Sequence, residues 1–322
     1  MRVELLPAAR VFALAAVLVA GCLVTGCAAQ PAPASVQKVQ HIVAKRTVAE
    51  PVHVTVIPDL SYGVAGAVQL RLDICMPTTS AHATATSRPA IVSIHGGSWM
   101  AGDKSEAAWR GMCEWLASSG YVVASLDYRL APTYVYPDQI NDVERAVEWL
   151  RAPIQARRFD LDPTLIGAFG GSAGGNLAAL LGTAGSGSLD RGHRVAAVVE
   201  LSGPADLTVR GAEAPLIKEH VLSYLGCTSF ASCPQAVAAS PIDNVDSSDP
   251  PFFIGHSQNE LIPLSQSLSF VQRLRAAHVA VTLVTMPGTL HSIAMLTPAL
   301  RSRIVDFFRA TLVHPAPAAA NS

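Results

Sequence analysis

The sequence lacks the charge imbalance typical of nucleic-acid-binding proteins and the cysteine spacing typical of zinc-binding proteins. Lysine and arginine total 23, and aspartate and glutamate total 24, so the formal net charge is −1. No field of one sign is available to attract a polyanion, and we expect no nucleic-acid partner. The six cysteines and ten histidines show no paired spacing typical of zinc, so we also expect no metal site. With 322 residues, half of them hydrophobic, the chain is long enough to bury one large core.

Charged residues are also absent from a stretch near the N-terminus. Residues 11–24 (VFALAAVLVAGCLV) form an uncharged apolar run that follows Arg2 and Arg10, which is the pattern of an export signal. The run is short for a membrane span, which needs about 20 residues. Counted from Val11 to Ala29 the uncharged stretch is longer, so an uncleaved anchor remains an alternative.

Two tetrapeptides in this region resemble the bacterial lipobox, VAGC ending at Cys22 and VTGC ending at Cys27. Cys27 is the better acceptor, because a linker rich in proline and alanine, residues 27–50, follows at once. The resemblance implies that residues 1–26 are a signal peptide and that the Cys27 thiol carries a lipid. The protein would then be exported and held by this anchor to the cell membrane, in the bacterial cell envelope, with its folded domain outside the cytoplasm. Cys22, or cleavage without a lipid, remains the alternative.

Four cysteines remain in the rest of the chain. Disulfides persist in the compartments that exported proteins reach. Cys227 and Cys233 lie close together in a loop-like stretch, GCTSFASCP, and we predict that they pair. Cys75 and Cys113 lie in a strand pattern and a helix pattern, and we expect each to be a small buried side chain.

Strand and helix patterns alternate through residues 51–314. Residues 52–60 and 68–77 alternate apolar with polar side chains, which predicts an antiparallel hairpin at a sheet edge. Continuous apolar runs, typical of strands buried on both faces of a parallel sheet, follow at residues 90–96, 121–128, 165–170, 195–203, 251–256 and 281–288. Helical patterns lie between them, at residues 105–118, 138–151, 174–182, 264–278 and 300–312. We expect an α/β fold with a mostly parallel sheet of about eight strands and helices on both faces, followed by a disordered tail at residues 315–322.

Residues 170–176 (GGSAGGN) surround a single serine with glycines. A serine at a sharp turn from strand to helix projects its hydroxyl above the sheet, and glycines two residues before and after make room for the turn. Gly170, Ser172 and Gly174 match this spacing, between a strand pattern and a helix pattern. The segment predicts a nucleophilic serine.

A second glycine-rich segment, HGGSWMAGDK at residues 95–104, follows the strand pattern at 90–96. Acyl transfer creates an alkoxide that must meet fixed donors, and such a loop offers free backbone N–H groups. We expect Gly97 and Ser98, together with Ala173 after the serine, to supply them. His95 suits a bracing role, and Asp127 and Tyr128 are assigned to structure as well.

The segments HGGSW, LDYRLAP (126–132), GGSAGGN, DPPFFIGHSQNELIP (249–263) and MPGTLHS (286–292) share their order and spacing with one family. Over about residues 53–312 the chain resembles the α/β-hydrolase esterases, in the hormone-sensitive-lipase-like and feruloyl or acetyl esterase-like (BD-FAE-like) branches. The resemblance implies an α/β-hydrolase catalytic domain at residues 51–314. It also implies a carboxylester hydrolase that uses serine, an acid and histidine in that chain order, without a cofactor.

The resemblance selects His291 as the base, because its loop lies late in the chain, where the family places its histidine. His256 matches the family's His-Gly pair and is given a structural role, although Ser257 stands where glycine is usual. The acid is ambiguous: alignment from His256 puts Glu260 at the acid position, and alignment backward from the Ile-Pro pair at 262–263 puts Asn259 there. We favour Glu260, whose extra methylene can span a shortened loop.

A third candidate for the acid is Asp206, near the end of the preceding strand pattern, which also suits a turn residue. The sequence thus predicts a Ser-Glu-His serine esterase acting on short-chain acyl esters, either small molecules or polymer-borne. Amide or formamide hydrolysis by the same residues is one alternative. A catalytically silent envelope protein that binds a ligand is another.

The length of residues 204–255 predicts a small lid insertion, closed by a disulfide between Cys227 and Cys233. No long cap precedes the first hairpin, so we expect an open site.

Overall fold

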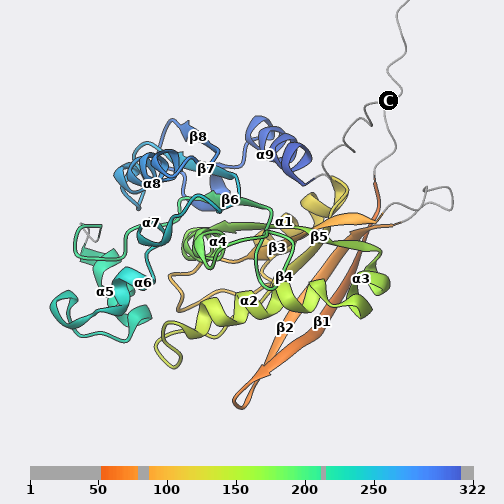
Figure 1. The fold of residues 1–322 in the computed structure, drawn as a ribbon, viewed down its shortest axis with the longest axis horizontal. Coiled ribbons are helices and arrows are strands. Elements are labelled where there is room, and N and C mark those ends of the chain that lie inside the picture. The colour runs from red at the N-terminus through yellow and green to blue at the C-terminus, as the bar shows by residue number, and fades with distance from the viewer. Residues whose placement is uncertain (1–51, 79–86, 212–214, 313–322) are drawn as a thin grey trace, which may run out of the picture. The chain divides into compact units, whose positions relative to one another are not determined.

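The computed structural model describes residues 52–78, 87–211 and 215–312, which build one sheet of eight strands with helices on both faces (Figure 1). The strands run in the order β1-β2-β4-β3-β5-β6-β7-β8. Only β2 runs against the others, because β1–β2 and β2–β4 are antiparallel and every other pair is parallel. The strands are β1 (Val54–Ala65), β2 (Val68–Pro77), β3 (Arg88–Ile94), β4 (Val122–Leu126), β5 (Leu161–Gly171), β6 (Ala197–Leu201), β7 (Phe252–Ser257) and β8 (Val281–Met286). This is the α/β-hydrolase fold that the sequence predicts, with the expected hairpin at one edge.

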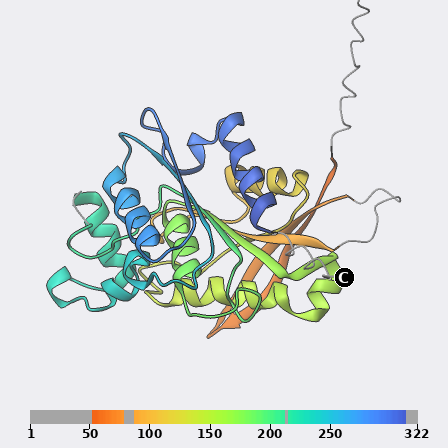
Figure 2. The same ribbon diagram turned by 45° about the horizontal axis from the view of Figure 1, so that its top comes forward.

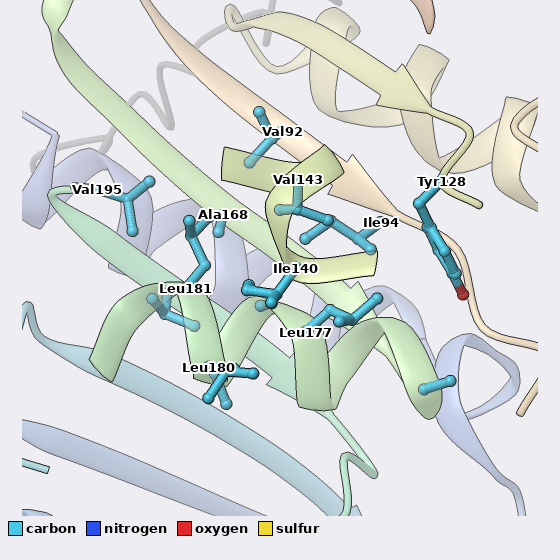
Figure 3. Packing of buried hydrophobic residues seen from close by; sticks show 14 of the residues in the cluster. Val92, Ile94, Tyr128, Ile140, Val143, Ala168, Leu177, Leu180, Leu181 and Val195 are labelled. Atoms are coloured by element: carbon cyan, nitrogen blue, oxygen red, sulfur yellow. The ribbon is translucent and has the colours of Figure 1, made fainter. Parts of the chain in front are cut away.

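The continuous apolar runs lie in the middle of the sheet because helices cover both of its faces. Every residue of β4 and of β6 is buried. On one face Val92 and Ile94 of β3 pack with Ile140 of α2 and Leu177 of α4 (Figure 3). Helix α4 is buried along its whole length, which explains why its sequence is mostly apolar and carries no charge.

The helices form two layers. The layer on one face consists of α2 (Asp138–Arg151), α3 (Pro153–Phe159), α4 (Ala173–Thr183) and α8 (Leu264–Ala276). On the other face lie α1 (Ala107–Ser118) and α9 (Pro298–Thr311). Helix α9 starts where the sequence favours a start, because the Thr297 side chain accepts a hydrogen bond from the Leu300 N–H group and Pro298 occupies the first turn.

The expected insertion lies between β6 and β7. It contains α5 (Pro215–Leu225), the short 3₁₀ helix η1 (Phe230–Ser232), α6 (Gln235–Ala238) and α7 (Pro241–Asn244). Both ribbon views place this teal segment at the side of the sheet away from α3 (Figures 1 and 2). A disulfide joins Cys227 and Cys233, the pair expected from the sequence, and closes the loop between α5 and α6.

Cys75 and Cys113 are buried as expected, but they also form a disulfide that was not predicted, with their Cα atoms 5.7 Å apart. Both side chains are fully buried. Strand alternation turns Ile74 toward one face of the sheet and Cys75 toward the other, where α1 packs. The bond ties β2 to α1, the helix that follows the glycine-rich loop at residues 95–104.

Several expectations fall outside the described residues. They are the signal peptide at residues 1–26 with Cys22, the linker at residues 27–50 with the proposed lipid acceptor Cys27, and the tail at residues 315–322. These remain predictions. Within residues 52–78, 87–211 and 215–312, no helix is both long enough and apolar enough to cross a bilayer.

The two disulfides should differ in their effect on stability, because they close loops of different length. The sequence separation is 38 residues for Cys75–Cys113 and 6 residues for Cys227–Cys233. By chain entropy, replacing both cysteines of the first pair with alanine should lower the free energy of unfolding by about 4 kcal/mol, against about 2 kcal/mol for the second pair. Urea denaturation of the two double variants measures both values. Equal losses would show that loop length does not control the effect.

Candidate active site

The turn from β5 into α4 holds Ser172 in a backbone conformation that few residues adopt. Its φ is 57° and its ψ is −123°, and its N–H group donates to the Leu201 carbonyl at 2.8 Å. A Cβ atom on Gly170 would lie 2.1 Å from the Gly174 carbonyl oxygen, and one on Gly174 would lie 2.1 Å from the Ile94 carbonyl oxygen. Glycine is therefore required on both sides of the serine, because the backbones touch there.

The loop at residues 95–104 brings free N–H groups to the same region. Gly97, Ser98 and Trp99 all have positive φ, at 116°, 55° and 60°. The N–H groups of Gly97 and Ser98 have no acceptor among the described residues. Ala173 is the first residue of α4, where an N–H group has no partner within the helix. All three groups predicted as oxyanion donors are thus available to a ligand.

An aromatic stack and a charged cluster brace this loop. The His95 ring stacks on Tyr128 with centroids 4.3 Å apart, and the Tyr128 hydroxyl donates to the His95 carbonyl at 3.0 Å. Burial lowers the pKa of His95, so this imidazole is neutral at physiological pH. Because His95 packs under the loop, it has the bracing position that the sequence suggests.

The charged cluster forms at the other end of the loop around Lys104. The buried ammonium lies 2.9 Å from Asp59 and 3.5 Å from both Asp73 and Asp127, and the Lys104 N–H group donates to the Asp127 carboxylate at 2.8 Å. These contacts tie the loop to β1, β2 and the end of β4. Asp127 is therefore a structural residue, as expected.

His291 and Glu260 meet at the ends of β8 and β7. The His291 Nδ1 atom donates to the Glu260 carboxylate. Its Nε2 atom and the Ser172 hydroxyl have no partner among the described residues, so both are free to react. The Glu260 side chain is fully buried, whereas 27% of the His291 side chain is exposed. The imidazole thus lies between a buried carboxylate and an open cleft.

The charge of Glu260 is stabilised from two sides. Burial alone would raise the pKa of the Glu260 carboxyl, but hydrogen bonds from His256 and His291, together with the charge of His256 and a hydrogen bond from Ser202, lower it to about 2. The Glu260 carboxylate is therefore ionised at neutral pH. An ionised partner at Nδ1 fixes the tautomer in which Nε2 can accept a proton.

Serines position the loop that carries His291. The Ser257 hydroxyl donates to the Leu290 carbonyl at 2.5 Å, and the Ser292 N–H group donates to the Ser202 hydroxyl at 2.9 Å. No sequence motif points to a role for Ser202 or Ser292. The serine at 257, in place of the usual glycine, was the one signal available, and its hydroxyl holds the residue next to His291.

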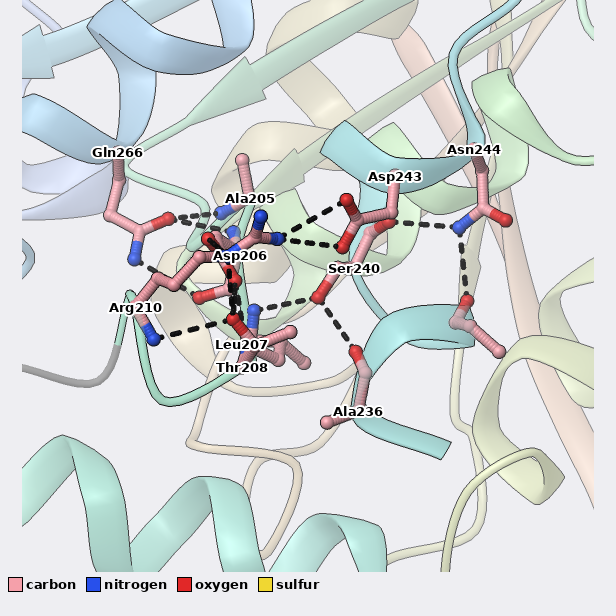
Figure 4. Close-up of polar contacts among 11 residues, drawn as sticks. Ala205, Asp206, Leu207, Thr208, Arg210, Ala236, Ser240, Asp243, Asn244 and Gln266 are labelled. Atoms are coloured by element: carbon pink, nitrogen blue, oxygen red, sulfur yellow. Dashed lines mark hydrogen bonds and ion pairs between the residues drawn. The ribbon is translucent and has the colours of Figure 1, made fainter. Parts of the chain in front are cut away.

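The other two acid candidates lie elsewhere. Asn259 is exposed, and only its backbone N–H group is bonded, to the Gly288 carbonyl at 3.1 Å. The Asp206 carboxylate accepts from Thr208 and pairs with Arg210, which also pairs with Asp243 (Figure 4). Asp206 is therefore part of a separate polar cluster beside α7, and the structure brings only Glu260 to His291.

Two cavities meet at Ser172, and Ser98 and Leu261 line both. The wide cavity is lined by His291 and has a volume of about 370 Å³. The narrow cavity has a volume of about 20 Å³, room for about one water molecule. It is lined by Ser98, Trp99, Ser172, Ala173, Pro204, Ile217, His220, Leu261 and Ile262.

The strand order, the strained serine and the paired histidine and glutamate define an α/β-hydrolase. The chain belongs to the BD-FAE family, whose sequence profile matches residues 72–274. This match covers the sheet from β2 to β7, the serine turn and Glu260.

Known proteins similar to the chain include two from Mycobacterium tuberculosis (strain ATCC 25618 / H37Rv). A protein named as the probable carboxylic ester hydrolase LipM is 32% identical over 252 residues, which are 74% of this chain and 56% of LipM. Esterase LipC is 32% identical over 219 residues, which are 65% of this chain and 54% of LipC. The matched region thus spans little more than half the length of these relatives.

Among solved structures, a truncated form of a carbohydrate esterase from gut microbiota is similar over nearly its whole length. Its TM-score is 0.68 at 25% identity, and the match covers 82% of this chain and 98% of that one.

Proposed function

We propose that the protein is a serine carboxylester hydrolase in which Ser172, His291 and Glu260 form the catalytic triad. One observation carries the proposal: the strained serine shares a cavity with His291, whose other ring nitrogen is bonded to a buried, ionised glutamate. The esterase names of LipM and LipC, and membership in the BD-FAE family, support the same class of reaction.

The reaction follows from the free atoms of the site. The Ser172 hydroxyl attacks the ester carbonyl, and His291 Nε2 takes its proton. The negative oxygen of the tetrahedral intermediate accepts hydrogen bonds from the N–H groups of Gly97, Ser98 and Ala173. The alcohol leaves with the proton from His291, and a water molecule activated by His291 then releases the acid and restores the serine.

The two cavities support an assignment of the two halves of the substrate. The leaving alcohol must receive its proton from His291, so it occupies the wide cavity, which His291 lines. The acyl group then occupies the narrow cavity, which Ser172 also lines. Its small free volume and its apolar wall, which includes Ile217 of α5, support a preference for short acyl chains such as acetyl.

We also propose that the protein works outside the cytoplasm, as a lipid-anchored protein of the cell envelope. Two disulfides in the described part of the chain support an oxidising compartment. The anchor itself rests on the sequence of residues 1–27 alone.

Replacement of Ser172 by alanine should lower kcat/KM for a chromogenic acetate ester by about 10⁶-fold, because the nucleophile is lost. Circular dichroism and thermal melting should be unchanged, since the alanine keeps the backbone of the turn. Undiminished turnover by Ser172→Ala would reject the mechanism.

Replacement of Glu260 by glutamine should lower kcat by about 10⁴-fold, because an amide cannot offset the charge of the imidazolium. Asn259→Ala is the matched control next to it, exposed and without side-chain contacts, and should change kcat by less than about twofold. The reverse ranking of the two variants would move the role of the acid to Asn259.

Shortening Ile217 to alanine should enlarge the acyl side of the site. We expect the ratio of kcat/KM for a butyrate ester to that for an acetate ester to rise about tenfold or more. Val221→Ala, on the same helix but outside the cavity, is the control for loss of buried volume. An unchanged ratio in Ile217→Ala, or an equal rise in Val221→Ala, would place the acyl group elsewhere.

A further inference from the structure

The Glu260 carboxylate is shared between two imidazoles. One oxygen accepts from His291 Nδ1, and the other lies 2.9 Å from His256 Nε2. The side chains of His256 and Glu260 are both fully buried, so solvent does not compete for these bonds. The catalytic mechanism uses only one of the two imidazoles.

The bonding of His256 fixes the proton on one of its nitrogens. Nε2 faces two acceptors, the Glu260 carboxylate and the Ile262 carbonyl at 2.9 Å, so it must carry a proton. Nδ1 lies 2.7 Å from the Ser267 hydroxyl on α8, which can either donate or accept. The ring is therefore fully bonded in its neutral form and equally in its cationic form.

Two titratable groups face His256, Glu260 from the loop after β7 and Glu200 from β6. Burial alone would lower the pKa of His256, but the hydrogen bond and charge of Glu260 and the bond to Ile262 raise it above its usual value. Burial raises the pKa of Glu200 to about 8, so this carboxyl is neutral at pH 7. Glu260 thus favours the protonated form of His256, and His256 favours the ionised form of Glu260.

We propose that His256 is a positioning residue for the triad, which holds the Glu260 carboxylate toward His291 and shares the negative charge of that carboxylate with it. The inference rests on the proposed function, because it treats His291 as the catalytic base. It differs from a merely structural role, in which His256 only joins β7 to α8. In that case replacing the ring would leave the titration of His291 unchanged.

The test is the pH profile of kcat/KM for an acetate ester, measured with the full chain and with His256→Gln. The glutamine amide can still donate to Glu260 but carries no charge. Because the glutamine amide draws less of the negative charge of Glu260 away from His291 than the imidazole does, protonated His291 is more stable in the variant, and the acidic limb should move up by roughly one pH unit. The rate at the optimum should fall by roughly 10- to 100-fold. Asn259→Ala is the control, because Asn259 lies beside Glu260 and has no contact with His256. It should leave both the acidic limb of the pH profile and the rate at the optimum unchanged.

A second measurement separates this inference from the proposed function. In the inactive Ser172→Ala chain, the ring protons of His291 are titrated by NMR with and without His256→Gln, and thermal melting verifies folding. An upward shift of the His291 titration supports the inference even if no ester is hydrolysed. An unmoved titration in a folded His256→Gln chain overturns it, whether or not the protein is an esterase.

Discussion

The rest of the site depends on one backbone approach that only glycine permits. At Gly170 and Gly174 the β5–α4 turn leaves no room for a Cβ atom, and this contact holds Ser172 at positive φ above the sheet. The same turn brings the carbonyl of Ile94, at the end of β3, against Gly174. The loop with the free N–H groups starts one residue later, so the serine and its oxyanion donors are positioned together. Lys104 and the Cys75–Cys113 disulfide then fasten that loop and α1 to β1 and β2.

Most of the fold could be predicted because buried parallel strands and their helices leave distinct patterns. The helix expected at residues 138–151 has those bounds in the structure, and the edge hairpin and the apolar central strands are present. The Cys75–Cys113 bond could not be predicted, because a buried thiol and a buried half-cystine have the same apolar surroundings. Only the packing of α1 on one face of β2 shows that the two sulfur atoms meet.

The candidate site was predictable where a motif restricts the backbone and ambiguous where it does not. The glycines around Ser172 and in the loop at 95–104 predict the backbone conformation of these two segments, because few other residues can adopt it. The acid was ambiguous because sequence spacing does not say how a turn directs its side chains, and Glu260 and Asn259 are neighbours. The structure turns Glu260 inward to His291 and leaves Asn259 exposed. The contact of Glu260 with His256 was not foreseeable, because it depends on how the loop after β7 turns the Glu260 carboxylate back toward that strand.

The central claim is that Ser172 is a nucleophile facing preformed N–H donors. A crystal structure of the protein treated with a short alkyl phosphonate ester tests this claim most directly. The account predicts a bond from Ser172 Oγ to phosphorus, with the phosphoryl oxygen about 3 Å from the N–H groups of Gly97, Ser98 and Ala173. Absence of an adduct at Ser172, or a phosphoryl oxygen turned away from those three groups, would contradict it.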